Sequence, residues 1–152
     1  MSKLVHNIIV TVFEKKEKRI QNIFNAFEQL LPIDFQKEKI TLTHEKAEGF
    51  HQKIIHILTM KTSRKRHNRL LLKTVFEMLS ENEKKTIENQ LESRIDEDGN
   101  FYIRLDKQSL LNNKYKITEK GDCFHFKIKL AAFPASRVGF LESADELIHR
   151  FD

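Results

Sequence analysis

The sequence lacks the features of an oxidised, membrane-spanning or multidomain protein. Cys123 is the only cysteine, so no internal disulfide can form and a reducing compartment is expected. No stretch approaches the roughly 18 apolar residues of a membrane helix, and the amino terminus lacks the apolar core of a secretory signal. Only two prolines and four glycines occur, so no flexible linker divides the chain. We therefore expect a cytoplasmic protein without membrane attachment, with one domain over residues 1–152.

Signatures of catalysis and of metal or cofactor binding are also missing. The seven histidines are scattered, and neither H-E-x-x-H, C-x-x-C, G-x-S-x-G nor G-x-G-x-x-G occurs. Cys123 lies among alternating apolar residues, which favours a small packing residue over a nucleophile. The acids at 96–98 adjoin Gly99 and indicate a solvated turn. We predict no enzymatic activity, no cofactor and no metal; the enzymatic alternative is a metal-independent nuclease that uses His125.

What the chain does contain is phenylalanine and positive charge. Twelve phenylalanines and 39% hydrophobic residues are enough to form a core. Lysine and arginine number 27 against 22 acidic residues, which gives a net charge of +5. A basic surplus favours a polyanionic partner such as nucleic acid or acidic lipid, and the clustering of the cations matters more than their sum.

The spacing of apolar residues predicts alternating strands and helices. We expect strands at 5–13, 39–43, 54–60, 101–105, 114–118 and 124–130, with a helix over 50–60 as the alternative at the third position. We expect helices from Ile20 to Pro32, from about Ser63 to Leu79, and after the capping-box patterns S-E-N-E at 80–83 and S-A-D-E at 143–146. This order predicts a two-layer α+β fold with one antiparallel or mixed sheet and helices packed on one face.

The first basic cluster lies at 61–73, K-T-S-R-K-R-H-N-R-L-L-L-K. On a helix its cations share one side, beside the leucines that belong to the core. Like charges at this spacing repel, and no acid occurs from Lys61 to Val75, so the cluster favours an anionic partner. Its apolar residues are needed for the core, which argues against membrane attachment. The candidate contacts in this cluster are Arg64, Lys65, Arg66, Arg69 and Lys73.

The second cluster lies on the last strands. Phe124, Phe126, Ile128 and Leu130 alternate with basic residues, so the cations project from the opposite face of the sheet. Arg104, Lys127 and Lys129 form this group. Tyr102 and His125 would add rings that can stack on bases if the face is open.

The stretch R-I-D-E-D-G-N-F-Y-I-R-L-D-K-Q at 94–108 resembles the signature of a family of small archaeal RNA-binding proteins, often described as predicted exosome subunits. The likeness extends to L-S-E-N-E-K-K-T-I-E and A-A-F-P-A-S-R. It implies a fold like that of the large-subunit ribosomal protein that binds 5S ribosomal RNA, and RNA binding without catalysis. It makes Arg104, Asp106, Lys107 and Gln108 the positions of interest. Residues 13–19 depart from the family pattern and support no assignment.

An architectural interpretation of this signature stays open. Asp98-Gly99 forms a turn, Asp106 can cap the short helix that follows it, and Arg104 can pair with Asp106. Our hypothesis is a non-catalytic RNA-binding protein that contacts structured or partly double-stranded RNA mainly through phosphates. A single groove would require the fold to place both basic clusters on one continuous surface. The candidate contacts are Arg64, Lys65, Arg66, Arg69, Lys73, Arg104, Lys107, Lys127 and Lys129. The alternative is a protein–protein interaction subunit whose basic patch docks on an acidic partner, in an RNA-processing complex or elsewhere.

Overall fold

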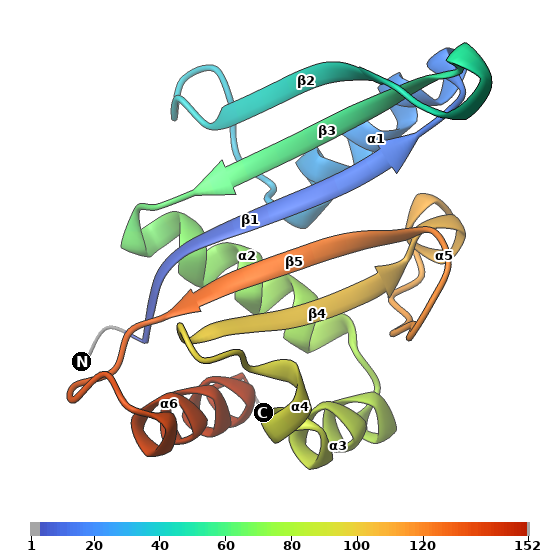
Figure 1. Cartoon of the computed structure of the whole chain (residues 1–152). Coiled ribbons are helices and arrows are strands. Elements are labelled where there is room, and N and C mark those ends of the chain that lie inside the picture. The colour runs from blue at the N-terminus through green and yellow to red at the C-terminus, as the bar shows by residue number, and fades with distance from the viewer. Residues whose placement is uncertain (1–3, 152) are drawn as a thin grey trace.

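A computed structural model describes residues 4–151, which form one five-stranded antiparallel sheet with helices (Figure 1). The strand order is β2-β3-β1-β5-β4. The strands are β1 (Val5–Glu14), β2 (Thr41–Glu48), β3 (Ile54–Thr62), β4 (Asn100–Asp106) and β5 (Cys123–Leu130). The helices are α1 (Ile20–Leu30), α2 (Lys65–Met78), α3 (Glu81–Asn89), α4 (Leu91–Arg94), α5 (Lys107–Leu111) and α6 (Arg137–His149), with short 3₁₀ turns at Glu17–Arg19 and Phe50–Gln52.

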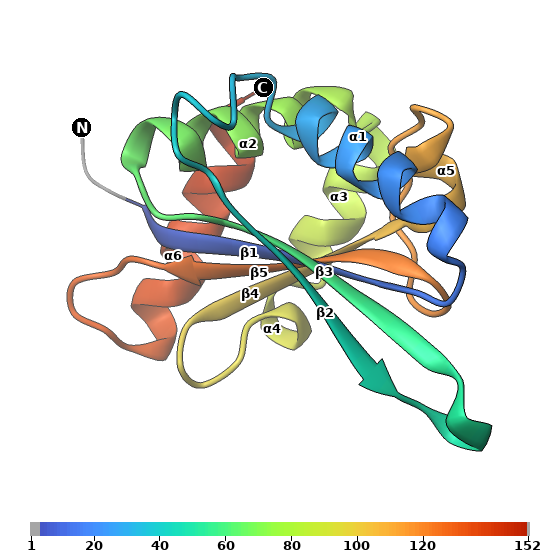
Figure 2. The same cartoon turned by 90° about the horizontal axis from the view of Figure 1, so that it is seen from above.

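One face of the sheet, here called the inner face, is covered by helices. Alternate residues of β1, β4 and β5 are buried, as the period of two in a pleated strand requires. Helices α1 and α2 lie on this side of the sheet (Figure 2). Helix α2 buries Leu71, Leu72, Val75 and Phe76 in the same core as Phe101, Phe124 and Phe126. The expected α+β class, with one antiparallel sheet and its main helices on one face, is confirmed.

Several expected elements are confirmed by the structure. Strand β1 and helix α1 occupy the predicted ranges to within a few residues, and the third strand is β3 rather than the alternative helix over 50–60. The capping box at 80–83 also forms, because the Ser80 hydroxyl accepts the N–H of Glu83 at 3.2 Å and caps α3. The Glu83 carboxylate reaches back as expected, but it accepts the Ser80 hydroxyl at 3.1 Å and not the Ser80 backbone N–H of a full capping box. Its other oxygen accepts the N–H of Ile117 at 2.7 Å.

Three elements differ from their predicted ranges. Strand β2 runs on to Glu48, so E-K-A-E belongs to the strand; every residue of β2 is exposed, and the strand therefore has no apolar alternation to reveal it. Residues 114–118 form only an isolated bridge between Ile117 and Leu105. Helix α6 begins at Arg137, where the Ser136 hydroxyl accepts the N–H of Gly139, and not at S-A-D-E. No helix within residues 4–151 is both long and apolar enough to cross a membrane.

Candidate nucleic-acid interface

The second face of the sheet, here called the outer face, is open. Strand register places four residues side by side in each of two rows that cross β3, β1, β5 and β4. None of these eight side chains is buried. Adjacent strands lie about 4.8 Å apart, so the ends of each row are separated by about 14 Å. The first row is Lys61, Ile9, Lys127 and Tyr102, and the second row is Thr59, Thr11, His125 and Arg104.

This arrangement gives the outer face both charge and rings. The rings of Tyr102 and His125 have centroids 5.4 Å apart. Arg104 is exposed, and its guanidinium donates to the backbone oxygen of Glu119 at 3.2 Å. Lys127 forms no ion pair with the residues that the structure describes. Lysine side chains of this kind can contact phosphates, and flat rings can stack on bases.

Lys61 is a cation of the outer face that sequence reasoning missed. It is exposed on β3, and both its neighbour Ile9 and the next residue of the row, Lys127, face the same way. Its spacing of two from Thr59 and four from Ile57 indicates that the three side chains share one face of the strand. We had grouped Lys61 with the helix cations because it begins the basic run that leads into α2. Lys129 lies on the same face, and its ammonium donates to the backbone oxygen of Asp98 at 2.6 Å.

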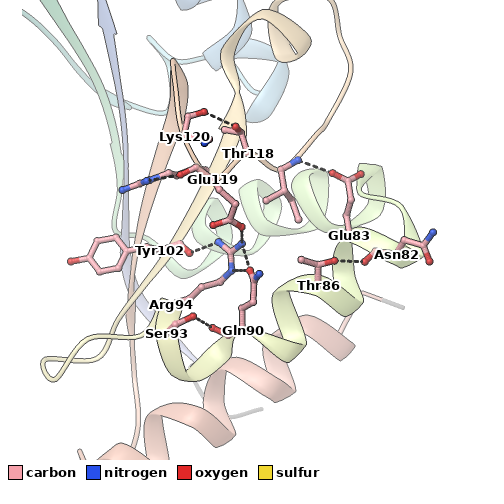
Figure 3. A network of polar contacts seen from close by, with 12 residues as sticks. Asn82, Glu83, Thr86, Gln90, Ser93, Arg94, Tyr102, Thr118, Glu119 and Lys120 are labelled. Atoms are coloured by element: carbon pink, nitrogen blue, oxygen red, sulfur yellow. Dashed lines mark hydrogen bonds and ion pairs between the residues drawn. The ribbon is translucent and has the colours of Figure 1, made fainter.

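The free edge of β4 is closed by a polar network (Figure 3). Arg94 donates to the backbone oxygen of Tyr102 at 3.3 Å and twice to the side-chain oxygen of Gln90, at 2.6 and 3.0 Å. Its guanidinium also pairs with the Glu119 carboxylate at 3.1 Å. The N–H of Thr118 donates to the backbone oxygen of Arg104 at 3.0 Å. These bonds satisfy an edge that would otherwise be free to pair with another strand.

The α2 cations lie on the opposite side of the molecule. Because α2 buries its leucines against the inner face, Arg66, Arg69 and Lys73 point away from the sheet. Arg64, Lys65, Arg66, Arg69 and Lys73 are all exposed, as expected. The two basic clusters therefore do not share one surface: the helix separates them because its apolar stripe has to face the core.

An acid from elsewhere in the chain reaches the α2 cations. Glu38, in the loop before β2, forms an ion pair with Arg66. The hydrogen bond from Arg66 lowers the pKa of Glu38, and the charges of His67 and Arg64 lower it further. Sequence reasoning missed this acid because it precedes Arg66 by 28 positions. Among the described residues, Lys65, Arg69 and Lys73 have no ion pair.

Several residues at the start of the 94–108 signature have partners within the fold. The Asp96 carboxylate accepts the backbone N–H groups of Asp98 and Asn100, the amide of Asn100 and the hydroxyl of Tyr102, all between 2.9 and 3.0 Å. Burial alone would raise the pKa of Asp96, but these bonds outweigh it and lower the pKa to about 2. Gly99 has φ +82°, and a Cβ there would lie 2.5 Å from the ring of Phe140. This turn therefore requires glycine.

The end of the signature also has structural partners. Asp106 caps α5 as expected, because its carboxylate accepts both the N–H and the hydroxyl of Ser109, at 3.0 and 2.6 Å, and these bonds lower its pKa. Asp106 does not pair with Arg104, because the Arg104 guanidinium donates to the backbone oxygen of Glu119. Gln108 lines a shallow hollow between α1 and α5.

Lys107 is placed where an RNA phosphate cannot reach it easily. The residue is 4% exposed, and its ammonium contacts the buried Glu14 carboxylate at 3.1 Å and the backbone oxygen of Phe13 at 2.6 Å. Burial would raise the pKa of Glu14, but bonds from the Lys16 N–H and from Lys107 outweigh it, so the pKa is lowered. We therefore assign Lys107 to the core and leave it out of the candidate interface.

One group of side chains within residues 4–151 has the spacing of metal ligands. Donor atoms of Glu88, Asp145 and His149 lie within 4.8 Å of one another. His149 pairs with both carboxylates across α3 and α6, at 3.4 Å to Glu88 and 3.6 Å to Asp145. Surface ion pairing accounts for this cluster, so we assign no metal to it.

Known proteins resemble this chain over nearly its whole length. A family model described as RNA binding matches residues 7–130. The RNA-binding protein PAB1135 of Pyrococcus abyssi is 26% identical, over 97% of this chain and 96% of its own length. The DUF54 protein Mth689 of Methanothermobacter thermautotrophicus is 28% identical, with a TM-score of 0.77, over 97% of this chain and 100% of its own. SSO0741 of Sulfolobus solfataricus, 22% identical with a TM-score of 0.72 over 93% and 96% of the two chains, shares the fold. Because the family model covers most of the sequence, the chain belongs to the RNA-binding family.

Proposed function

We propose that this protein binds RNA without cleaving it, mainly through backbone phosphates that lie across the outer face of the sheet. The observation that carries the proposal is the open pair of rows on that face, where Lys127 and Arg104 lie beside two aromatic rings and Lys61 lies at the far end of the first row. Cations whose charge is not cancelled by a nearby carboxylate attract phosphates most strongly. The outer-face cations are Lys61, Arg104, Lys127 and Lys129.

The α2 cations form a second, separate basic surface. An RNA segment that lies flat on the outer face does not reach them, because the sheet and α2 lie between. Arg66 is in addition paired with Glu38, which reduces its attraction for a phosphate. We therefore expect the outer face to provide most of the affinity, with Arg64, Lys65, Arg69 and Lys73 providing a weaker, longer-range attraction.

The relation to RNA processing or degradation, and to the fold of the 5S-rRNA-binding ribosomal protein, stays a prediction. An accessory role in such processes fits a protein that holds RNA without cleaving it. The protein–protein alternative differs in one respect, which is that the basic surface would then meet acidic side chains and not phosphates.

Two matched double variants test which surface binds. Arg104→Gln/Lys127→Gln removes two charges from the outer face, and Arg69→Gln/Lys73→Gln removes two from α2. Fluorescence-anisotropy titrations with a labelled mixed-sequence RNA at several salt concentrations give the slope of log affinity against log salt. Each lost single-strand phosphate contact reduces that slope by about 0.7. We expect a reduction of about 1.4 for the outer-face variant and little change for the α2 variant.

Other outcomes contradict the proposal. A reduced slope for the α2 variant alone would move the interface to the helix. Absence of RNA binding at micromolar protein in low salt would favour the protein-interaction alternative. Cleavage of the labelled RNA by the purified protein, seen on a denaturing gel and abolished by His125→Ala, would replace the non-catalytic assignment with the nuclease alternative.

A further inference from the structure

A hollow of about 450 Å³ lies at the β4 end of the outer face. Its floor includes Tyr102, Arg104 and His125, and one wall is formed by Arg94 of α4 together with Gln90, which precedes that helix. A second wall is formed by Thr118 and Glu119. The volume is within the range of pockets that hold small organic groups, so it is large enough for one nucleotide. Neither Gln90, Arg94 nor Glu119 was among the candidate contacts from the sequence.

The hollow is rigid because its parts are tied to the fold. The Tyr102 hydroxyl donates to the Asp96 carboxylate at 2.9 Å, which fixes the ring against the sheet. Arg94 is held by Gln90, by Glu119 and by the edge of β4, as Figure 3 shows. A site that is already ordered loses little conformational entropy when a ligand enters.

The floor of the hollow presents rings with little net charge. Burial lowers the pKa of His125, and the charges of Arg104 and Lys127 lower it further, so its ring is neutral at pH 7. Its partner ring, Tyr102, is also neutral, because burial and the Asp96 carboxylate raise its pKa. The two neutral rings have centroids 5.4 Å apart and planes tilted by 38°, so the pair offers an aromatic face on which one base can stack, whereas a phosphate gains little from it.

The walls add groups that can bond to the edge of a base. Gln90 uses its side-chain oxygen to hold Arg94, so its amide N–H groups remain available as donors among the described residues. Glu119 holds Arg94 through one carboxylate oxygen, and its second oxygen is an acceptor. The edge of a base carries hydrogen-bond donors and acceptors side by side, so the Gln90 amide and the Glu119 oxygen can bond to it together.

We propose that the hollow binds one unpaired nucleobase, stacked on Tyr102 and His125, and that the protein therefore prefers single-stranded RNA or an unpaired loop. This inference rests on the proposed function, since the outer-face cations hold the phosphates on either side of the base. In a duplex both faces of each base are covered by its neighbours, so the rings can reach a base only where pairing is broken. If the ligand is a structured or partly double-stranded RNA, the hollow therefore binds one of its unpaired segments.

The test compares one 12-nucleotide mixed-sequence RNA as a single strand and annealed to its complement. The variant Tyr102→Leu/His125→Leu removes the rings and leaves the cations. Tyr102→Phe is the matched control, because it keeps the ring and loses only the hydroxyl bonded to Asp96. Stacking on aromatic side chains supplies enough binding energy that we expect a roughly 5- to 100-fold loss of single-strand affinity in the double variant. Its salt slope should stay unchanged, and Tyr102→Phe should bind nearly as the unaltered protein does.

A second measurement covers the case in which the double variant fails to fold. A 2-aminopurine placed at one position of an oligouridine should lose fluorescence when it stacks in the hollow of the unaltered protein and of Tyr102→Phe. Undiminished emission on saturation would overturn the proposal. So would equal affinity for the strand and the duplex at matched salt.

The failure of this inference can be told from the failure of the proposed function. If Tyr102→Leu/His125→Leu binds both RNAs as the unaltered protein does while Arg104→Gln/Lys127→Gln weakens both, the outer face binds phosphates and the base site is absent. If the unaltered protein binds neither RNA, the proposed function itself is overturned.

Discussion

Replacing Lys107 by methionine tests whether the signature at 94–108 serves the fold or the ligand. Methionine has nearly the volume of lysine but no charge, so the change removes the partner of a buried carboxylate and leaves the packing almost intact. Glu14 and Lys107 are each 5% exposed at the side chain, with their charged atoms 3.1 Å apart. Removing one member of such a pair costs about 3–5 kcal/mol.

The structure places the expected loss near the lower end of that range. Glu14 keeps its hydrogen bonds from the backbone N–H groups of Lys15 and Lys16, at 2.9 and 3.1 Å, after Lys107 is replaced. We therefore expect the free energy of unfolding to fall by about 3 kcal/mol, which lowers the Tm of a chain of this size by about 6–12 °C. The matched control is Lys114→Met at an exposed lysine, which should change the stability by less than about 0.5 kcal/mol.

Urea denaturation followed by circular dichroism measures the loss, and its pH dependence identifies the cause. In the unaltered protein the folded-state pKa of Glu14 is lowered, so the carboxylate contributes stability above its unfolded pKa and loses it as the pH falls. Without Lys107 that folded-state pKa should rise, so the deficit of the variant should shrink as the pH is lowered towards 5. A loss below about 1 kcal/mol, together with an RNA salt slope reduced by about 0.7, would refute the reasoning and return Lys107 to the interface.

Two further predictions concern the turn before β4. Because the pKa of Asp96 is lowered to about 2 in the folded state, its contribution to stability is present above the unfolded pKa and is lost as the pH falls from about 5 to 2. Allowing for solvent screening of this partly exposed group, we expect Asp96 to contribute about 1–2 kcal/mol to the free energy of unfolding. Urea unfolding at several pH values measures this contribution, and the Asp96→Asn variant should lack that part of the pH dependence. Gly99→Ala should destabilise the protein by about 1–3 kcal/mol more than Gly121→Ala, by the same assay, because both residues have positive φ but only the first Cβ would strike Phe140. Equal losses for the two glycines would show that backbone strain, and not the clash, sets the requirement.

The elements that could be predicted from the sequence are those in which a single local cause dominates. Strand β5 alternates apolar residues with polar ones, so its two faces are fixed by burial alone. Helix α3 begins at Glu81 because the hydroxyl of the preceding Ser80 caps it by accepting the N–H of Glu83. Strand β2 could not be delimited, since all its residues are exposed and its pairing with β3 comes from backbone hydrogen bonds that carry no side-chain pattern.

Two residues of the 94–108 signature show why the type of a side chain does not reveal its role. Arg104 and Lys107 are both cations, three positions apart in R-L-D-K-Q. Arg104 is exposed at the outer face, whereas Lys107 begins α5 and turns into the core, where Glu14 meets it from β1. The partner is distant in sequence, so no local pattern could separate the two roles.

The sequence by itself determined the α+β class, the two sides of β4 and β5 and the existence of two basic clusters, because burial of apolar residues follows periods of 2 and 3.6. Only the tertiary structure decided where those clusters lie. Helix α2 packs its leucines on the inner face, so its cations point away from the outer face that carries Arg104 and Lys127. The fold likewise brought Glu38 to Arg66. These outcomes depend on which elements pack against each other, and contacts between segments far apart in the sequence produce no repeating residue pattern from which they could be predicted.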